Sequence, residues 1–309
     1  MQVSFIIPLY DCVALTQATI ASLQATLPQG LEHEIILVDD GSTDGTRAWL
    51  ATLREPFRVV LHERNQGYAA ANNHGAAIAR GDVLALLNND LVLTPRWLEP
   101  MLDLHRRLGP TAGLVGNIQR EVATGAIDHA GIFINSKGKP EHARTLPWWS
   151  WIPGTRAQTV AMVTGACVLI DRGLWQRLGG FDEAYINGCE DVDLCLRARQ
   201  DGRVNAVALR STVYHHVSSS AGRKARNEQN TFRLTLRWQR ELAAYAVRRW
   251  CQDFYEGNLF LPRDRHPGLS LRIWAYGTGL SHTPPPQAVA AVDEAIALEL
   301  ARWQKMFAR

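Results

Sequence analysis

The stretch Glu-Ile-Ile-Leu-Val-Asp-Asp-Gly-Ser-Thr-Asp-Gly-Thr, residues 34–46, decides the fold. Its apolar, β-branched start predicts a buried strand from Glu34 to Val38. The strand stops at two aspartates, a glycine and a serine, and helical spacing follows from Thr43 to Leu53. A buried strand that passes through a short polar turn into a helix is typical of α/β proteins.

The same alternation continues on both sides of this stretch. It predicts further strands and helices at Val3–Leu9, Thr16–Leu27, Arg58–Leu61, Tyr68–Arg80 and Val83–Leu87. Strands that alternate with helices of this length predict a mostly parallel sheet with helices on both faces. Ligands of such sheets bind outside the carboxyl ends of the strands, so functional residues are expected there.

Two carboxylates follow the second predicted strand. Asp39 and Asp40 are placed to accept hydrogen bonds from a nucleobase or a ribose hydroxyl. A polar turn here is also explained by helix capping, a role that suits Ser42 and Asp44. We therefore predict a ligand role for the two adjacent aspartates and a capping role for the other two residues.

A glycine-containing loop precedes the Ala-rich helix. Arg64, Asn65 and Gly67, with Asn73 one turn into that helix, are predicted to contact a diphosphate through backbone N–H groups and positive charge. Asn-Gly pairs also mark ordinary turns, so this feature alone is weak. The first strand is not followed by a dinucleotide-binding glycine motif, and no P-loop occurs in the sequence.

The fourth predicted strand ends in Asn88-Asn89-Asp90. A carboxylate directly after a buried strand can bind Mg²⁺ or Mn²⁺, which such sites share with substrate phosphates. The cation would balance the charge that develops on a departing diphosphate. The alternative is an Asx-turn that only ends the strand.

A second acidic pair occurs about a hundred residues later. Glu190 and Asp191 lie at a predicted helix start, where acids are favoured by the helix dipole alone. Their functional interpretation is a general base that takes a proton from an acceptor hydroxyl. His215 and His216 follow a strand-like segment and are predicted to supply a further metal ligand.

The rest of the chain has a mixed pattern. Val160–Ile170 reads as a strand, and the segments 231–250 and 286–307 as helices. Trp148, Trp149 and Trp151 lie in a predicted loop, where they either contact an acceptor sugar or a partner surface, or plug the core. We predict a domain of residues 1–220, with a nucleotide-binding half (1–115) and an acceptor-binding half (116–220), and a C-terminal helical extension (221–309).

Composition excludes several classes of protein. The chain has 309 residues, is 46% hydrophobic and carries a formal charge of +3, so a nucleic-acid partner is not indicated. Five scattered cysteines without a C-x-x-C pair argue against a disulfide framework or a structural zinc site. With no signal peptide or membrane span, we expect a cytoplasmic location. Residues 221–309 hold 14 Lys and Arg against 8 Asp and Glu, which suits a membrane surface or an anionic acceptor, or a solvated helical face.

Seven segments, in this order, resemble glycosyltransferase family 2, whose members are inverting and have the GT-A fold. They are FIIPLYD (5–11), EIILVDDGSTDGT (34–46), NQGYAAANNHGAA (65–77), LALLNNDLVL (84–93), VTGACVLI (163–170), GGFDEAYINGCEDVDLCLRARQDG (179–202) and YHHVSSSAGR (214–223). The resemblance runs from Val3 to Ala221, over two thirds of the chain, and the tail matches no motif. It implies a GT-A-type, Rossmann-like mixed sheet.

The resemblance also implies roles for individual residues. Asp191 would be the general base with Glu190 beside it, and Asp90 the main metal carboxylate, joined by His215 or His216. Asn88 replaces the first aspartate of the family's D-x-D metal motif, as in rhamnosyltransferase-like members that build bacterial surface polysaccharides. The nucleotide and sugar subsites would be formed by Pro8, Tyr10, Asp39, Asp40, Asn65, Gly67, Asn88, Asn89, Gly165 and Ala166.

The function expected from these features is metal-dependent transfer of a sugar from a UDP-, dTDP- or GDP-linked donor to a glycan or lipid-linked saccharide. A non-catalytic nucleotide- or glycan-binding module would keep the same pocket. A sugar-1-phosphate nucleotidyltransferase would need a Gly-, Arg- and Lys-containing loop after the first strand, and residues 13–19 contain none of these. The sequence does not indicate an oligomeric state.

Overall fold

The structure is a computed structural model that describes residues 1–216, 223–258 and 267–308. It divides into two compact units, residues 1–132 with 142–223, and residues 133–141 with 224–309. The predicted boundary at residues 220–221 and part of the segment YHHVSSSAGR lie outside the described residues. The predicted division into domains therefore stays a prediction.

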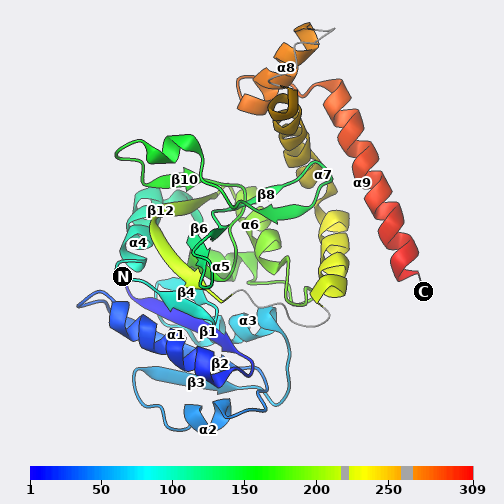
Figure 1. Ribbon diagram of the computed structural model, residues 1–309. Coiled ribbons are helices and arrows are strands. Elements are labelled where there is room, and N and C mark those ends of the chain that lie inside the picture. Colours follow the sequence, from blue (N-terminus) through cyan, green and yellow to red (C-terminus); the bar gives the residue numbers. More distant parts are fainter. Residues whose placement is uncertain (217–222, 259–266, 309) are drawn as a thin grey trace. The chain divides into compact units, whose positions relative to one another are not determined.

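The first unit begins with a parallel sheet (Figure 1). Its strands β4, β1, β2 and β3 are neighbours in that order, with Val3 aligned with both His33 and Val83. All seven residues of β1 are buried, as expected for a strand covered on both faces. In chain order the elements are β1 (Val3–Leu9), α1 (Val13–Thr26), β2 (His33–Asp39), α2 (Thr46–Leu50), β3 (Phe57–Leu61), α3 (Tyr68–Ile78) and β4 (Val83–Leu87).

The sheet continues beyond β4 with mixed strand directions. The full order is β10-β12-β6-β11-β4-β1-β2-β3, in which β11 is antiparallel to both of its neighbours and β12 is parallel to β6. Two short strands join at the side, β5 on β12 and β7 on β6. The added elements are β5 (Leu91–Leu93), α4 (Leu98–Leu108), η1 (Gly109–Thr111), β6 (Ala112–Glu121), β7 (Ile127–His129), η2 (Trp148–Trp151), β10 (Ala157–Thr159), β11 (Cys167–Asp171), α5 (Arg172–Leu178), α6 (Glu190–Gln200) and β12 (Val204–His215).

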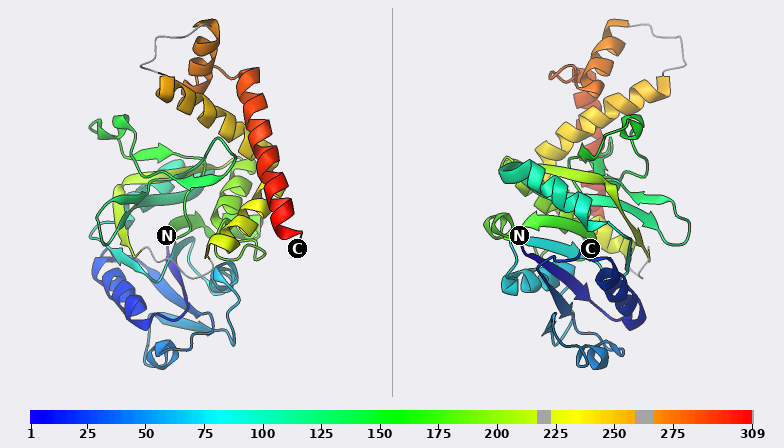
Figure 2. Two further views of the ribbon diagram at one scale, coloured as in Figure 1. Left: turned by 45° about the vertical axis from the view of Figure 1, so that its right-hand side comes forward. Right: turned by 90° about the vertical axis from the view of Figure 1, so that its left-hand side faces the viewer.

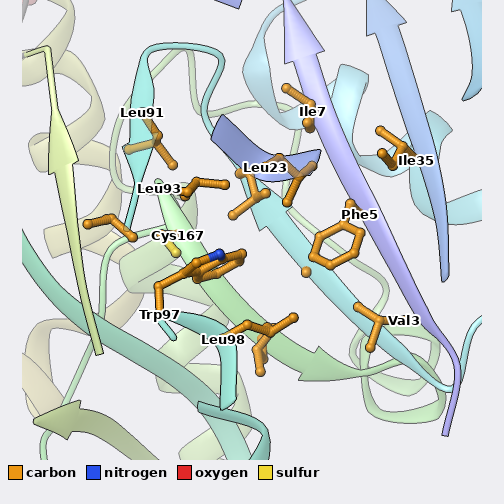
Figure 3. Close-up of a cluster of buried hydrophobic side chains, with 14 of the residues drawn as sticks. Val3, Phe5, Ile7, Leu23, Ile35, Leu91, Leu93, Trp97, Leu98 and Cys167 are labelled. Carbon is orange, nitrogen blue, oxygen red and sulfur yellow. The ribbon is translucent and has the colours of Figure 1, made fainter. Parts of the chain in front are cut away.

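Strand alternation places helices on both faces. On one face Phe5 and Ile7 join Leu23 of α1 and Leu98 of α4 in the hydrophobic core, with Trp97 fully buried among them (Figure 3). On the other face α3 packs against β1 and β2. A Cβ at Gly75 of α3 would lie 2.5 Å from Cγ2 of Ile6, so only glycine permits this approach. The predicted mixed sheet with helices on both faces is confirmed.

The second unit contains the predicted C-terminal helices. They are α7 (Arg223–Asn258), which is kinked at Trp238, α8 (Pro267–Thr278) and α9 (Pro286–Phe307), drawn in yellow to red in Figure 2. The tip of a hairpin formed by β8 (Ile132–Ile134) and β9 (Pro140–His142) belongs to this unit. Lys139 in that tip pairs with Glu299 of α9 at 2.9 Å and lies over the ring of Trp303. No helix in the described ranges is long and apolar enough to span a membrane.

Candidate active site

Both aspartates after β2 are buried and hold neighbouring loops. Asp39 accepts hydrogen bonds from Nε of Arg47 at 2.8 Å and from the Ser42 N–H at 3.3 Å. Asp40 accepts from the Gln66 and Gly67 N–H groups, each at 2.8 Å, and pairs with His62. The two side chains therefore shape the polar turn and the glycine loop; their direct contact with a nucleotide stays a prediction.

The predicted capping residues behave differently from each other. Asp44 accepts from the N–H groups of Thr46 and Val13, at the starts of α2 and α1. Ser42 caps neither helix by this route; its Oγ accepts from the Asp11 N–H at 2.8 Å. Asp44 thus accepts the first N–H group of each helix without being the N-cap residue of either, since those are Gly45 and Cys12, whereas Ser42 fixes the turn after β1.

The glycine loop and the adjacent strand end carry the other nucleotide-side predictions. Tyr10, Arg64 and Asn65 are exposed, Gly67 is half-buried, and Pro8 is buried within β1. Asn73 is different, because its amide bonds the backbone of Phe181 in both directions and donates to Glu183. With both ends of its amide engaged, Asn73 ties α3 to the 181–183 turn, and its contact with the nucleotide stays a prediction.

The turn after β4 meets the end of β12. His215, the last residue of β12, is aligned with Leu91 of β5, and this pairing carries its imidazole to Asp90. Nε2 of His215 lies 3.1 Å from Oδ1 of Asp90. His216 instead donates its backbone N–H to the Asp90 carbonyl at 3.0 Å. Of the two predicted histidines, His215 is the one whose ring faces the carboxylate.

Orphaned polar atoms at this turn fit a divalent cation. Oδ1 of Asp90, Oδ1 of Asn88 and Nδ1 of His215 are buried without a hydrogen-bond partner among the described residues; the 3.1 Å pair between Asp90 and His215 lacks hydrogen-bond geometry. Oxygen ligands and one imidazole suit Mg²⁺ or Mn²⁺. No cluster of three or more His, Cys, Asp or Glu side chains forms a complete metal site in the described part of the chain.

Asn89 does not share this arrangement. Its side chain donates to Oγ1 of Thr16 at 2.9 Å, and its carbonyl accepts from Thr19 at 2.9 Å. These two bonds connect the turn after β4 to α1. Asn89 therefore supports the shape of the turn, and the orphaned atoms belong to its neighbours Asn88 and Asp90.

The predicted base lies at the start of α6 and bonds a loop before β11. Oδ2 of Asp191 accepts the Gly165 N–H at 2.9 Å, while the Gly165 carbonyl accepts the Tyr68 hydroxyl at 2.9 Å. A Cβ at Gly165 would lie 3.3 Å from that hydroxyl and 3.5 Å from Cβ of Asp191. Gly165 thus fits tightly between the base and the phenol, and Ala166 beside it accepts the Asn88 N–H at 2.8 Å.

Three carboxylates gather around Tyr68. Burial and then the charges of Glu190 and Asp191, with a smaller effect from Asp90, raise the pKa of Tyr68 well above its usual value. Burial and then the charge of Asp191 raise the pKa of Glu190 to about 8. Glu190 therefore favours its protonated form more than an ordinary glutamate does.

The family of this chain follows from a match to a family model. Residues 4–178, more than half of the chain, match the model of glycosyl transferase family 2. The chain belongs to this family.

Relatives of this family 2 chain agree with that assignment. It is 32% identical over 235 residues to the O-antigen biosynthesis protein RfbC of Myxococcus xanthus, covering 71% of this chain and 18% of the relative. It is 28% identical to the N-acetylglucosaminyl-diphospho-decaprenol L-rhamnosyltransferase of Mycobacterium tuberculosis, covering 61% and 68%. Two curated relatives with 32% and 33% identity are much longer, and the chain spans only 18% and 31% of their lengths.

Solved structures share the fold. The crystal structure of GalNAc-T7 with UDP, GalNAc and Mn²⁺ superposes with a TM-score of 0.64 at 17% identity, covering 87% of this chain and 54% of that one. The match includes most of the family 2 chain. At this identity it shows a GT-A-like fold and nothing finer.

The tryptophan loop of the family 2 chain is exposed. Trp148 and Trp151 in η2 are 78% and 80% exposed, and Ile152 beside them is 49% exposed, whereas Trp149 is half-buried. The alternative that these tryptophans plug the core is wrong for Trp148 and Trp151. Their exposure favours a surface that contacts another molecule.

The sequence did not single out Tyr68 or His62. Tyr68 follows Gly67 in the glycine loop, and its place in that predicted phosphate loop was the signal available. His62 follows β3 as Asp40 follows β2, and its Nδ1 lies 2.7 Å from Oδ1 of Asp40. Polar residues after every strand of a parallel sheet are thus candidates, even where no motif marks them.

Proposed function

We propose that this chain transfers a sugar from a nucleotide-activated donor to a hydroxyl of a glycan or lipid-linked saccharide, with inversion at the anomeric carbon. The observation that carries the proposal is the 164–166 loop: Gly165 bonds Asp191 and Tyr68, and Ala166 accepts the N–H of Asn88, where the turn on which Asp90 faces His215 begins. Displacement of a diphosphate requires a base for the acceptor hydroxyl, here Asp191, and a group that stabilises the departing charge, here a cation bound by Asp90 and His215.

The proposed mechanism uses Asp191 as the base. Asp191 takes the proton of the acceptor hydroxyl, whose oxygen attacks the anomeric carbon from the face opposite the nucleotide. The bond to the nucleoside diphosphate breaks as the new glycosidic bond forms. Asp90 and His215 would hold Mg²⁺ or Mn²⁺, which stabilises negative charge on the departing diphosphate.

The donor and acceptor sides are assigned as follows. The nucleotide of a UDP-, dTDP- or GDP-linked sugar would lie against Pro8, Tyr10 and the loops held by Asp39 and Asp40, within reach of Arg64 and Asn65. Gly165 and Ala166 would form the bottom of the sugar subsite. Trp148, Trp149 and Trp151 would meet the acceptor. The relatives named for O-antigen synthesis and rhamnosyl transfer support a deoxyhexosyl or hexosyl donor and a role in surface polysaccharide synthesis.

Release of nucleoside diphosphate from a panel of sugar nucleotides, with Mg²⁺ or Mn²⁺ and mixed glycan acceptors, tests the function. We expect release from one donor and its loss with chelator. Binding of a donor without release from any member of the panel would favour a binding module instead. Formation of a sugar nucleotide from a sugar 1-phosphate would identify a nucleotidyltransferase.

We also propose a cytoplasmic location with peripheral contact to the membrane. None of the five cysteines, all within the described ranges, forms a disulfide. Trp148 and Trp151 expose amphipathic rings, and residues 142–161, none of which is buried, include no Asp or Glu. Such a surface suits anionic lipid headgroups.

Cosedimentation with vesicles of anionic phospholipid tests this contact. We expect the wild type to bind, and the double variant Trp148→Ser/Trp151→Ser to lose most binding because the interfacial aromatic rings are gone. Leu61→Ser removes a side chain that is 57% exposed on β3 and is the matched control. Absence of wild-type binding, or equal loss in the control, would remove the membrane contact from the proposal.

A further inference from the structure

His129 is a fully buried imidazole at the end of β7 that the proposed mechanism does not use. Its Nε2 lies 3.2 Å from the Gly131 backbone nitrogen and 3.3 Å from the Thr164 backbone nitrogen. Both groups are N–H donors, so Nε2 is an acceptor and the ring proton sits on Nδ1, which is buried without a hydrogen-bond partner among the described residues. One side chain thereby joins the turn after β7 to the loop before β11.

That loop is where the candidate site is assembled. Its next residue, Gly165, donates to Asp191 and accepts from Tyr68. The residue after that, Ala166, accepts the Asn88 N–H at the start of the turn that carries Asp90. Consecutive peptide groups therefore connect His129, the base and the metal-side turn.

We propose that His129 is a positioning residue, which holds the 164–166 loop through its unprotonated Nε2 and so places Asp191 for proton transfer. This inference rests on the proposed function for the role of Asp191, but not for the hydrogen bonds. Burial and then the nearby imidazoles of His142 and His215 lower the pKa of His129 well below its usual value, which keeps the acceptor nitrogen available.

The His129 ring also packs against its neighbours, and this role has to be distinguished from its role as a hydrogen-bond acceptor. His129 meets the ring of His142 edge-on, with centroids 5.0 Å apart. A phenylalanine would keep this aromatic contact while leaving two buried N–H groups without an acceptor, a state that the loop relieves by moving. A glutamine would lose the aromatic ring but keep an oxygen that can accept both N–H groups.

The pair of variants His129→Gln and His129→Phe therefore distinguishes the two roles. We expect His129→Gln to keep kcat within about 5-fold of wild type, and His129→Phe to lower kcat by about 10- to 100-fold, because a small displacement of a catalytic group is costly. KM for the donor should change by less than about 3-fold in both, since the loss concerns the reacting geometry. Equal losses in the two variants, with equally lowered thermal unfolding midpoints, would overturn the proposal in favour of packing.

Histidine-ring ¹⁵N NMR of the wild-type protein tests the acceptor without any variant and without turnover. We expect the His129 signals to report a neutral ring with the proton on Nδ1 from pH 6 to pH 8, where an ordinary histidine titrates. A protonated Nε2, or an imidazolium in this range, would overturn the proposal even if the chain releases nucleoside diphosphate. If no donor is turned over but the Nδ1–H tautomer is found, the proposed function fails while the loop-holding contact stands.

Discussion

Replacing Asp191 by Asn is expected to lower kcat by about 10²- to 10⁴-fold while leaving donor affinity within about 3-fold of wild type, because general-base catalysis is lost and little else changes. The asparagine has the same shape, and with its amide oxygen toward Gly165 it can still accept the N–H that Asp191 accepts at 2.9 Å, although it then loses the Val192 N–H that Oδ1 accepts at 2.8 Å. The loop should stay in place. Single-turnover kinetics together with calorimetric titration of the donor would measure the two quantities separately.

Glu190→Gln is the matched control, because it changes the adjacent acid on the same helix turn. With its pKa raised to about 8, Glu190 is protonated at neutral pH, and a glutamine reproduces its charge. We expect this variant to keep kcat within about 10-fold at pH 7, far above the Asn variant. Above pH 8 the wild type gains a second negative charge beside Asp191 and the variant does not, so their pH profiles should diverge on the alkaline side.

Two results would contradict this assignment of roles. If Glu190→Gln is the more damaging substitution at neutral pH, the base is Glu190. If Asp191→Asn retains full turnover, this carboxylate only stabilises the start of α6 through the helix dipole, which is the alternative that the sequence left open.

The sequence predicted the strand–helix alternation from β1 to β4 well, because the hydrophobic pattern of the strands differs from that of the helices. Strands β1, β2 and β4, which are buried except for the half-buried His33 at the start of β2, lie where the apolar runs predicted them. Helix α2 is shorter than the predicted Thr43–Leu53, because Thr52 and Leu53 continue as turns with N–H bonds three residues back. Turns of that kind repeat apolar residues at nearly the same spacing as a helix.

The predicted strand Val160–Ile170 shows where pattern alone is insufficient. Only its last part is strand β11, which begins at Cys167. Val163 and Thr164 are buried like strand residues, yet their N–H groups bond Sγ of Cys195 and Nε2 of His129 instead of a neighbouring strand. An apolar run reports burial and does not say which partner satisfies the backbone, so neither the loop nor His129 was predictable from the local sequence.

For the candidate site, the types of residue in the sequence predicted its chemistry better than their local spacing predicted which of them lie together. Asp90 and His215 are 125 positions apart in the sequence, and only the pairing of β5 with β12 brings them together. Asn73 was placed in the nucleotide site because it follows a glycine loop, but its amide is used by the 181–183 turn. Contacts between residues far apart in the sequence determine which side chains meet, and local spacing in the sequence does not reveal them.

Replacing Asp90 by Ala is expected to lower kcat/KM by about 10²- to 10³-fold or more, because the developing charge on the diphosphate loses its cation. The same variant should lose the dependence of nucleoside diphosphate binding on Mg²⁺ or Mn²⁺, which calorimetric titration measures without turnover. His215→Ala should have the same sign with a smaller effect, since it removes a neutral ligand and not a charge.

His216→Ala is the control for both substitutions. His216 contacts the turn through its backbone N–H to the Asp90 carbonyl, and this bond survives removal of the imidazole. We expect activity within about 3-fold of wild type and unchanged metal dependence, as for surface substitutions away from a site. If His216→Ala abolishes metal-dependent binding while His215→Ala does not, the ring beside Asp90 is not the ligand. If Asp90→Ala keeps metal-dependent binding intact, the orphaned oxygens of this turn serve the sugar or its diphosphate directly, and the cation has to be held elsewhere.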